Sequence, residues 1–161
     1  MRVLYIAPEI SIPGTHGGSS HVKEMTDSLA RLGHHVTLLT KHDKGQPFID
    51  HTTTTNLRTL VFGPSIIRNA IYFLSTFFTT FILILFSHVD LIIERGRIFA
   101  GTGILIGKLF KKKTAYELVE PYTEVPLYTG ALTKHSLLYR AIRAWHNLVV
   151  NASTLTLITH H

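Results

Sequence analysis

Short apolar runs alternate with amphipathic segments along the whole chain. The runs are five or six residues long and end at turn residues, which is typical of strands buried on both faces of a parallel sheet. Between them, apolar residues recur at helical spacing. Gly33, after the first such segment, predicts a left-handed helix stop. The pattern predicts strands at 3–7, 35–40, 57–62, 89–94, 114–118 and 154–159, and helices at 19–32, 70–87, 98–110 and 136–150.

The order of these elements predicts the fold class. A strand, a helix and a second strand follow within the first 40 residues, at the spacing of a right-handed βαβ unit. Six strands alternating with helices indicate an α/β protein with a doubly wound, Rossmann-like parallel sheet, folded as one domain. Because such sheets bind ligands at the carboxyl ends of their strands, we expect the site in the loops after the first, fourth and fifth strands.

Composition narrows the classes of partner. The 161 residues are 45% hydrophobic and 16% charged, which fits a buried core rather than disorder. The net charge of +6 favours anionic partners such as phosphates or lipid headgroups. We do not expect nucleic acid, because the basic cluster Lys111–Lys113 lies between apolar segments without alternating aromatics. The absence of cysteine and of a signal peptide favours a cytoplasmic location.

The segment 70–87 has no charged side chain and is long enough to approach a membrane span. Five serine and threonine residues interrupt it, and a predicted strand follows almost at once. Dense phenylalanine and isoleucine favour contact with a membrane surface. Three interpretations stay open: a core helix, an interfacial helix in peripheral contact with a membrane, and a true span.

A glycine-rich loop joins the first strand to the first helix. Gly17 and Gly18, preceded by His16, allow a ligand to approach backbone N–H groups at a helix N-terminus, where an anion is favoured. The loop is neither a dinucleotide fingerprint nor a P-loop, and it also fits a simple turn. A second glycine-rich segment, 100–108, lacks the Walker residues, and we interpret its glycines as close helix packing.

Charged residues also end the fourth and fifth strands. Glu94 and Arg95 end one, and Glu117 and Glu120 lie at the end of the other, so these groups are expected to gather at one sheet edge. Such groups suit hydroxyl recognition or acid–base chemistry, and a simple surface ion pair is the alternative. None of the eleven histidines has the spacing of a metal site, so no metal ion is expected.

Several segments together resemble the N-terminal domain of family 4 glycosyltransferases. Residues 2–6, the Gly-Gly-Ser-Ser-His-Val run at 17–22 and the run from Leu29 to Thr40 are similar to the opening of these enzymes. Residues 117–124 are similar to the segment after their fifth strand, and residues 153–159 to a strand near the end of their first domain. The resemblance covers almost the entire chain.

The resemblance implies one half of a GT-B fold. It implies transfer of a sugar from a nucleotide-sugar donor, with retention of anomeric configuration and no metal cofactor, to a glycan or lipid-linked acceptor. Gly17, Gly18 and His16 would lie beside the donor phosphates. Arg95 would bind substrate, and Glu117 or Glu120 would face the acceptor or take a catalytic role.

The resemblance also implies that residues 1–161 lack the last helix and strand of this domain and the C-terminal donor-binding domain. We therefore expect the chain to be inactive alone, and to be completed by a longer gene product or by a separate donor-binding subunit. It would work in the cytoplasm or on the inner face of the membrane. Two alternatives remain: a non-catalytic Rossmann-like module that binds a nucleotide or phosphate, and a membrane-associated subunit of a split glycosyltransferase.

Overall fold

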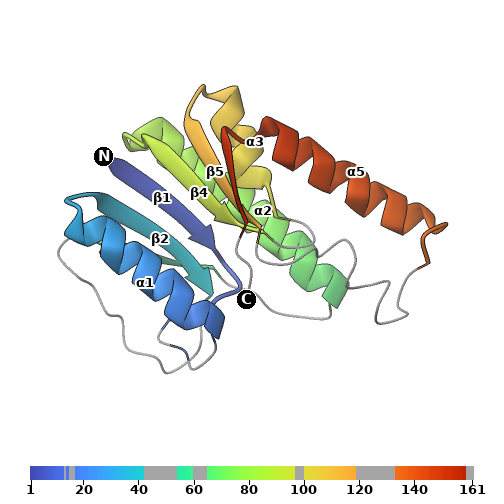
Figure 1. Ribbon diagram of the computed structural model, residues 1–161, viewed down its shortest axis with the longest axis horizontal. Coiled ribbons are helices and arrows are strands. Elements are labelled where there is room, and N and C mark those ends of the chain that lie inside the picture. The colour runs from blue at the N-terminus through green and yellow to red at the C-terminus, as the bar shows by residue number, and fades with distance from the viewer. Residues whose placement is uncertain are drawn as a thin grey trace.

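The computed structural model describes residues 1–12, 14, 17–41, 54–59, 65–96, 100–118 and 133–158. In this part of the chain six parallel strands form one sheet in the order β3-β2-β1-β4-β5-β6, which confirms the doubly wound α/β fold (Figure 1). The strands are β1 Arg2–Ala7, β2 His35–Lys41, β3 Thr54–Thr59, β4 Leu91–Arg95, β5 Lys113–Leu118 and β6 Leu155–Ile158. The helices are α1 Gly17–Arg31, α2 Ser65–Phe86, α3 Thr102–Leu109 and α5 Leu137–Ala152.

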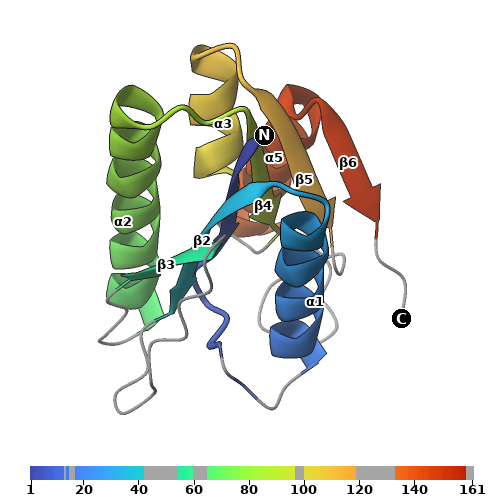
Figure 2. The same ribbon diagram turned by 90° about the vertical axis from the view of Figure 1, so that its left-hand side faces the viewer.

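The helices cover opposite faces of the sheet (Figures 1 and 2). One face packs side chains such as Val3 and Ile93 against α1, through its buried Val22. The other face packs the alternate side chains, such as Leu4 and Ile92, against α2 and α3, and α5 joins α3 farther along the sheet. β1 and β4 lie at the centre of the sheet, and β1 is buried on both faces, as its continuous apolar run predicts.

Three elements differ from the expected boundaries by three residues or more, and one of them, α2, begins at Ser65 rather than at residue 70. β3 is Thr54–Thr59 rather than 57–62, so part of the threonine run belongs to the strand; β-branched threonine fits a pleated surface well. α3 begins at Thr102 rather than at residue 98, because Gly101 before it has φ 120°, which no helical residue adopts. Gly33 has φ 81° and ends α1 as predicted.

The glycines of α3 bring the helix close to the sheet. A Cβ at Gly103 would lie 2.3 Å from Ile6 Cδ1, and one at Gly107 would lie 2.5 Å from Thr114 Cγ2. Both glycines are buried. This geometry confirms the packing interpretation of residues 100–108.

α2 contains most of the uncharged segment 70–87, and Arg68 precedes that segment in its sequence. Among the residues that the structure describes, no helix has the length and apolarity that crossing a membrane requires. The hydroxyls that interrupt its sequence include Thr76 and Thr80, which point inward and are fully buried. α2 therefore packs on the sheet through one stripe and leaves much of its apolar surface outside.

Candidate functional site

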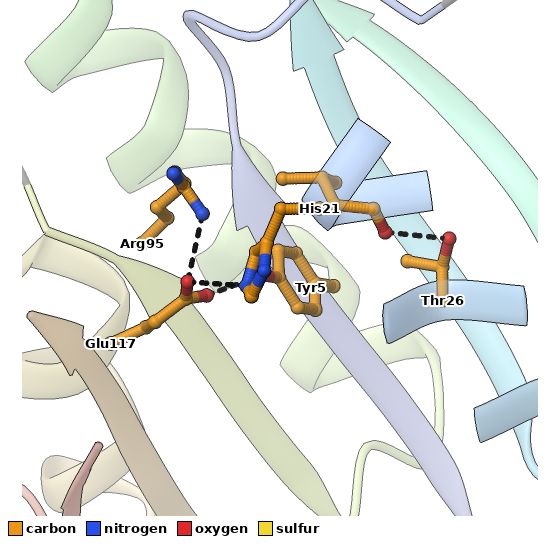
Figure 3. Close-up of polar contacts among 6 residues, drawn as sticks. Tyr5, His21, Thr26, Arg95 and Glu117 are labelled. Atoms are coloured by element: carbon orange, nitrogen blue, oxygen red, sulfur yellow. Dashed lines mark hydrogen bonds and ion pairs between the residues drawn. The ribbon is translucent and has the colours of Figure 1, made fainter. Parts of the chain in front are cut away.

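A polar cluster lies at the carboxyl edge of the sheet, centred on Glu117 near the end of β5 (Figure 3). The Glu117 side chain is 1% exposed, and three groups from other elements reach it. Arg95 Nη1, at the end of β4, donates a hydrogen bond of 2.7 Å to Oε1. The hydroxyl of Tyr5, from β1, donates to Oε2. His21 Nε2, from α1, lies 2.7 Å from Oε1 without the alignment of a hydrogen bond.

Burial and a neighbouring charge keep the Tyr5 hydroxyl of this cluster protonated. Burial, and then the negative charge of Glu117, raise the pKa of the Tyr5 hydroxyl above its ordinary value. Tyr5 therefore stays a proton donor to the carboxylate. Because a buried carboxylate is costly unless it is paired, Arg95 and Tyr5 together explain how Glu117 lies inside the protein.

The first turn of α1 forms the border of this cluster. A Cβ placed on Gly18 would lie 3.8 Å from Arg95 Nη2 and 3.1 Å from Ile10 Cδ1. Gly18 therefore lies beside the guanidinium without a side chain of its own, whereas a Cβ on Gly17 would meet nothing within 4 Å. The positive end of α1 and the Arg95 guanidinium are thus neighbours, and together they favour an anion electrostatically.

The second carboxylate expected at this edge points elsewhere. Glu94 precedes Arg95 in β4, and successive strand residues face opposite sides of the sheet. Its Oε1 accepts a hydrogen bond of 2.6 Å from Gly101 N, and Oε2 accepts one of 3.1 Å from Ile104 N, at the start of α3. Burial raises the pKa of Glu94 to about 7, although these N–H groups oppose the shift. The prediction that Glu94 joins the cluster was therefore wrong.

The structure brings together Gly18, Arg95 and Glu117 from the predicted set, with Gly17 at the start of the same helix. His16 and Glu120 lie outside the described residues. Tyr5 and His21 were not predicted as site residues. A tyrosine inside an otherwise apolar strand was one available signal, because a buried hydroxyl needs a partner. His21 lies four residues after Gly17, one helical turn into α1, which was another.

Exposure decides which members of the cluster can meet a ligand. The side chain of His21 is 27% exposed and that of Arg95 is 10% exposed, whereas Glu117 is closed off behind them. Of these side chains, His21 and Arg95 are therefore the ones with surface open to solvent, and Glu117 contacts both from the interior with Tyr5 behind it. Within the described ranges, no three histidine, aspartate or glutamate side chains are grouped as ligands for a metal ion.

The fold is that of one half of a GT-B glycosyltransferase. Over 99% of this chain, a sucrose-phosphate synthase from Thermosynechococcus elongatus superimposes with a TM-score of 0.67 and 12% identity. The apo structure of UGT2 from Phytolacca americana superimposes over the whole chain with a TM-score of 0.62 and 9% identity. UGT2 has also been solved in complex with UDP-2fluoro-glucose and pterostilbene. A UDP-GlcNAc 2-epimerase from Methanocaldococcus jannaschii superimposes over 99% of the chain with a TM-score of 0.51 and 11% identity.

These matches cover 42%, 46% and 40% of the three solved chains, so this chain spans less than half of their length. No family model and no curated protein matches the sequence. At these identities the likeness establishes the fold. An epimerase is among the matches, so the fold does not identify the reaction, and only the residues of the site can indicate it.

Proposed function

We propose that this chain is the acceptor-side half of a glycosyltransferase that transfers a sugar from a nucleotide-sugar donor to a glycan or lipid-linked acceptor. The proposal includes retention of anomeric configuration and no metal requirement, both taken from the family resemblance. The observation that carries it is the cluster of Arg95, His21 and Glu117 beside the N-terminus of α1, at the carboxyl edge of a GT-B-like half.

Each group has a distinct role in this proposal. The N–H groups of the first turn of α1 and the Nη2 group of Arg95, which lies beside Gly18, bind donor phosphate. His21 contacts the acceptor hydroxyl or the phosphate through its exposed edge. Glu117 holds Arg95 and His21 in place, so it acts as a positioning residue. His16 and Glu120 remain candidates on sequence grounds.

The proposal requires a donor-binding half, supplied by a longer gene product or by a separate subunit. The first step is to read the DNA after the codon for residue 161, in all three frames, for a second Rossmann-like domain. The two halves are then produced together, and release of nucleoside diphosphate and labelled product is measured with a panel of nucleotide sugars. His21→Asn should lower kcat/KM by about ten-fold or more.

A matched control uses His34, which follows α1 at its far end. His34→Asn makes the same chemical change away from the cluster and should leave kcat/KM unchanged. Equal activity of His21→Asn and the parent would overturn the assigned role of His21. The joined halves could also turn over no nucleotide sugar while this chain alone binds nucleotide. That result would favour the non-catalytic binding module instead.

A further inference from the structure

The two sides of α2 have an unusual distribution of polarity. The inward stripe contains Thr76 and Thr80, which are fully buried, and Ile84, which belongs to the core, yet other large apolar side chains of the helix are exposed. A helix that only covers a sheet has charged and polar residues on its outward face. We define the outer face of α2 as its five apolar residues that are at least half exposed: Leu74, Phe78, Ile82, Leu85 and Phe86.

Positive charge borders this outer face at the amino edge of the sheet. α3 packs beside α2, and the rings of Phe81 and Phe110 lie 5.7 Å apart, which places the end of α3 next to the last turns of α2. Lys108, Lys111 and Lys113 are exposed there. Leu109 lies among them and is also exposed.

Acidic charge near this surface is compensated. Asp90 follows α2 at the same edge, and its Oδ2 accepts a hydrogen bond of 2.8 Å from Arg2 N. That bond and the nearby positive charges of the N-terminus, Lys112 and Arg2 lower the pKa of Asp90. Between residues 71 and 86 the helix itself carries no acidic side chain. The surface as a whole is therefore apolar with a basic border.

We propose that the outer face of α2 and the adjoining lysines 108–113 bind the surface of an anionic lipid bilayer. Apolar side chains enter the boundary between headgroups and acyl chains, and lysines meet the anionic headgroups. The helix lies in the plane of the membrane without crossing it. This inference stands on the exposure and charge of α2 and α3, and it does not depend on sugar transfer.

Charge distinguishes the bilayer from a second copy of the chain. A symmetric dimer through the outer face would carry the same lysines on both partners and would bring like charges to one interface. A bilayer with anionic lipids offers hydrocarbon and negative charge to the same surface at once. The observations therefore favour lipid, and self-association becomes an outcome of the test.

The experiment is co-sedimentation of the 161-residue chain with vesicles of phosphatidylcholine and phosphatidylserine, compared with vesicles of phosphatidylcholine alone. We expect binding to the anionic vesicles that weakens as salt is raised. Ile82→Ser/Phe86→Ser should reduce the partition coefficient by roughly ten-fold or more. Lys108→Gln/Lys113→Gln should reduce it by roughly thirty-fold, since each lysine near an anionic surface contributes about five-fold.

Matched controls lie on α5 and the turn before it. Leu137→Ser/Leu138→Ser removes side chains that are 81% and 52% exposed, close to the 83% and 52% of Phe86 and Ile82. Lys134→Gln/Arg140→Gln removes two exposed charges at the opposite edge of the sheet. Both controls should bind vesicles like the parent.

Two results would overturn the proposal. One is the absence of binding to anionic vesicles at low salt by a chain whose circular dichroism shows that it is folded. The other is a dimer in analytical ultracentrifugation that Ile82→Ser/Phe86→Ser dissociates while vesicle binding stays equal to that of the parent. Neither measurement uses a nucleotide sugar, so failure here is separate from failure of the proposed transferase function.

Discussion

Arg95 Nη1 donates a hydrogen bond of 2.7 Å to Oε1 of Glu117, and this contact joins the carboxyl ends of β4 and β5. The two residues are also register partners in the sheet. The backbone therefore sets the side chains next to each other before any ligand arrives. The hydrogen bond pairs the buried Glu117 carboxylate and also fixes a guanidinium that lies beside Gly18, at the first turn of α1.

Removing the arginine should destabilise the fold. Arg95→Ala leaves the buried Glu117 carboxylate without its cationic partner, and we expect the free energy of unfolding to fall by about 3 kcal/mol. Urea denaturation followed by circular dichroism measures this change. Arg143→Ala, at an exposed position on α5, should change it by less than about 0.5 kcal/mol. A similarly small change for Arg95→Ala would mean that water replaces the guanidinium at Glu117.

Glu94 should make stability fall as the solution becomes basic. Its pKa in the folded protein is about 7, above the ordinary 4.5, so the folded state binds the proton more tightly. The contribution of Glu94 protonation to the free energy of unfolding is fully present below the ordinary pKa and is lost as pH rises through about 7. The free energy of unfolding should fall by about 3 kcal/mol over this range. Urea midpoints between about pH 4.5 and pH 8 test this expectation.

Glu94→Gln keeps an oxygen for the Gly101 N–H but cannot titrate, so it should flatten that pH dependence. The comparison also cancels the contribution of His146, whose pKa burial lowers, because both proteins retain it. Glu24→Gln, at an exposed position of α1, is the control and should keep the parent profile. An unchanged slope in Glu94→Gln would assign the pH dependence to another group.

Filling the space under α3 should weaken packing. A methyl group at Gly107 would lie 2.5 Å from Thr114 Cγ2 and 2.9 Å from Ile92 Cδ1, closer than atoms can pack. Gly107→Ala should lower the free energy of unfolding by about 2 kcal/mol despite the higher helix propensity of alanine. Gly17→Ala, where a Cβ meets nothing within 4 Å, should cause no loss. Equal stability of the two variants would show that α3 shifts easily.

A side chain at Gly18 should block the anion. Gly18→Val places a Cβ 3.1 Å from the movable end of Ile10 and 3.8 Å from Arg95 Nη2, so the added methyl groups crowd the guanidinium once Ile10 shifts. Losing a charge-assisted phosphate contact of about 1.5–3 kcal/mol corresponds to binding about ten-fold to a hundred-fold weaker. NMR titration of the chain with UDP measures it, with Gly17→Val as the control. Unchanged affinity would place any bound phosphate elsewhere.

The alternation of strands and helices and the doubly wound class followed from the sequence, because buried parallel strands and amphipathic helices have different periods. The strand order came from the structure. The third strand was misplaced by three residues at an edge of the sheet. Threonine is compatible with both loop and strand, and what decided it was the pairing of Val36 with Thr54, a contact between residues far apart in the chain.

The candidate site was predicted in part for a similar reason. Arg95 and Glu117 were expected near each other because both end buried strands. Glu94 was expected with them, but the alternation along β4 sends neighbouring side chains to opposite faces, and one sequence does not say which of the two faces the cluster. Tyr5 and His21 enter the cluster from β1 and α1; local signals mark both residues, but their contacts with Glu117 join segments about 100 residues apart in the chain.

The sequence by itself determined the α/β class, the alternation of strands and helices, the glycine stop of α1 and the packing role of the α3 glycines. These are properties of local periodicity and backbone sterics. Tertiary structure decided that the carboxylate buried behind Arg95 is Glu117 and that the carboxylate capping α3 is Glu94. It also decided which side of α2 faces outward. Those outcomes depend on strand register and on packing between distant segments. The burial of Glu94 and Glu117 and the exposure of one side of α2 therefore exist only once the sheet has formed.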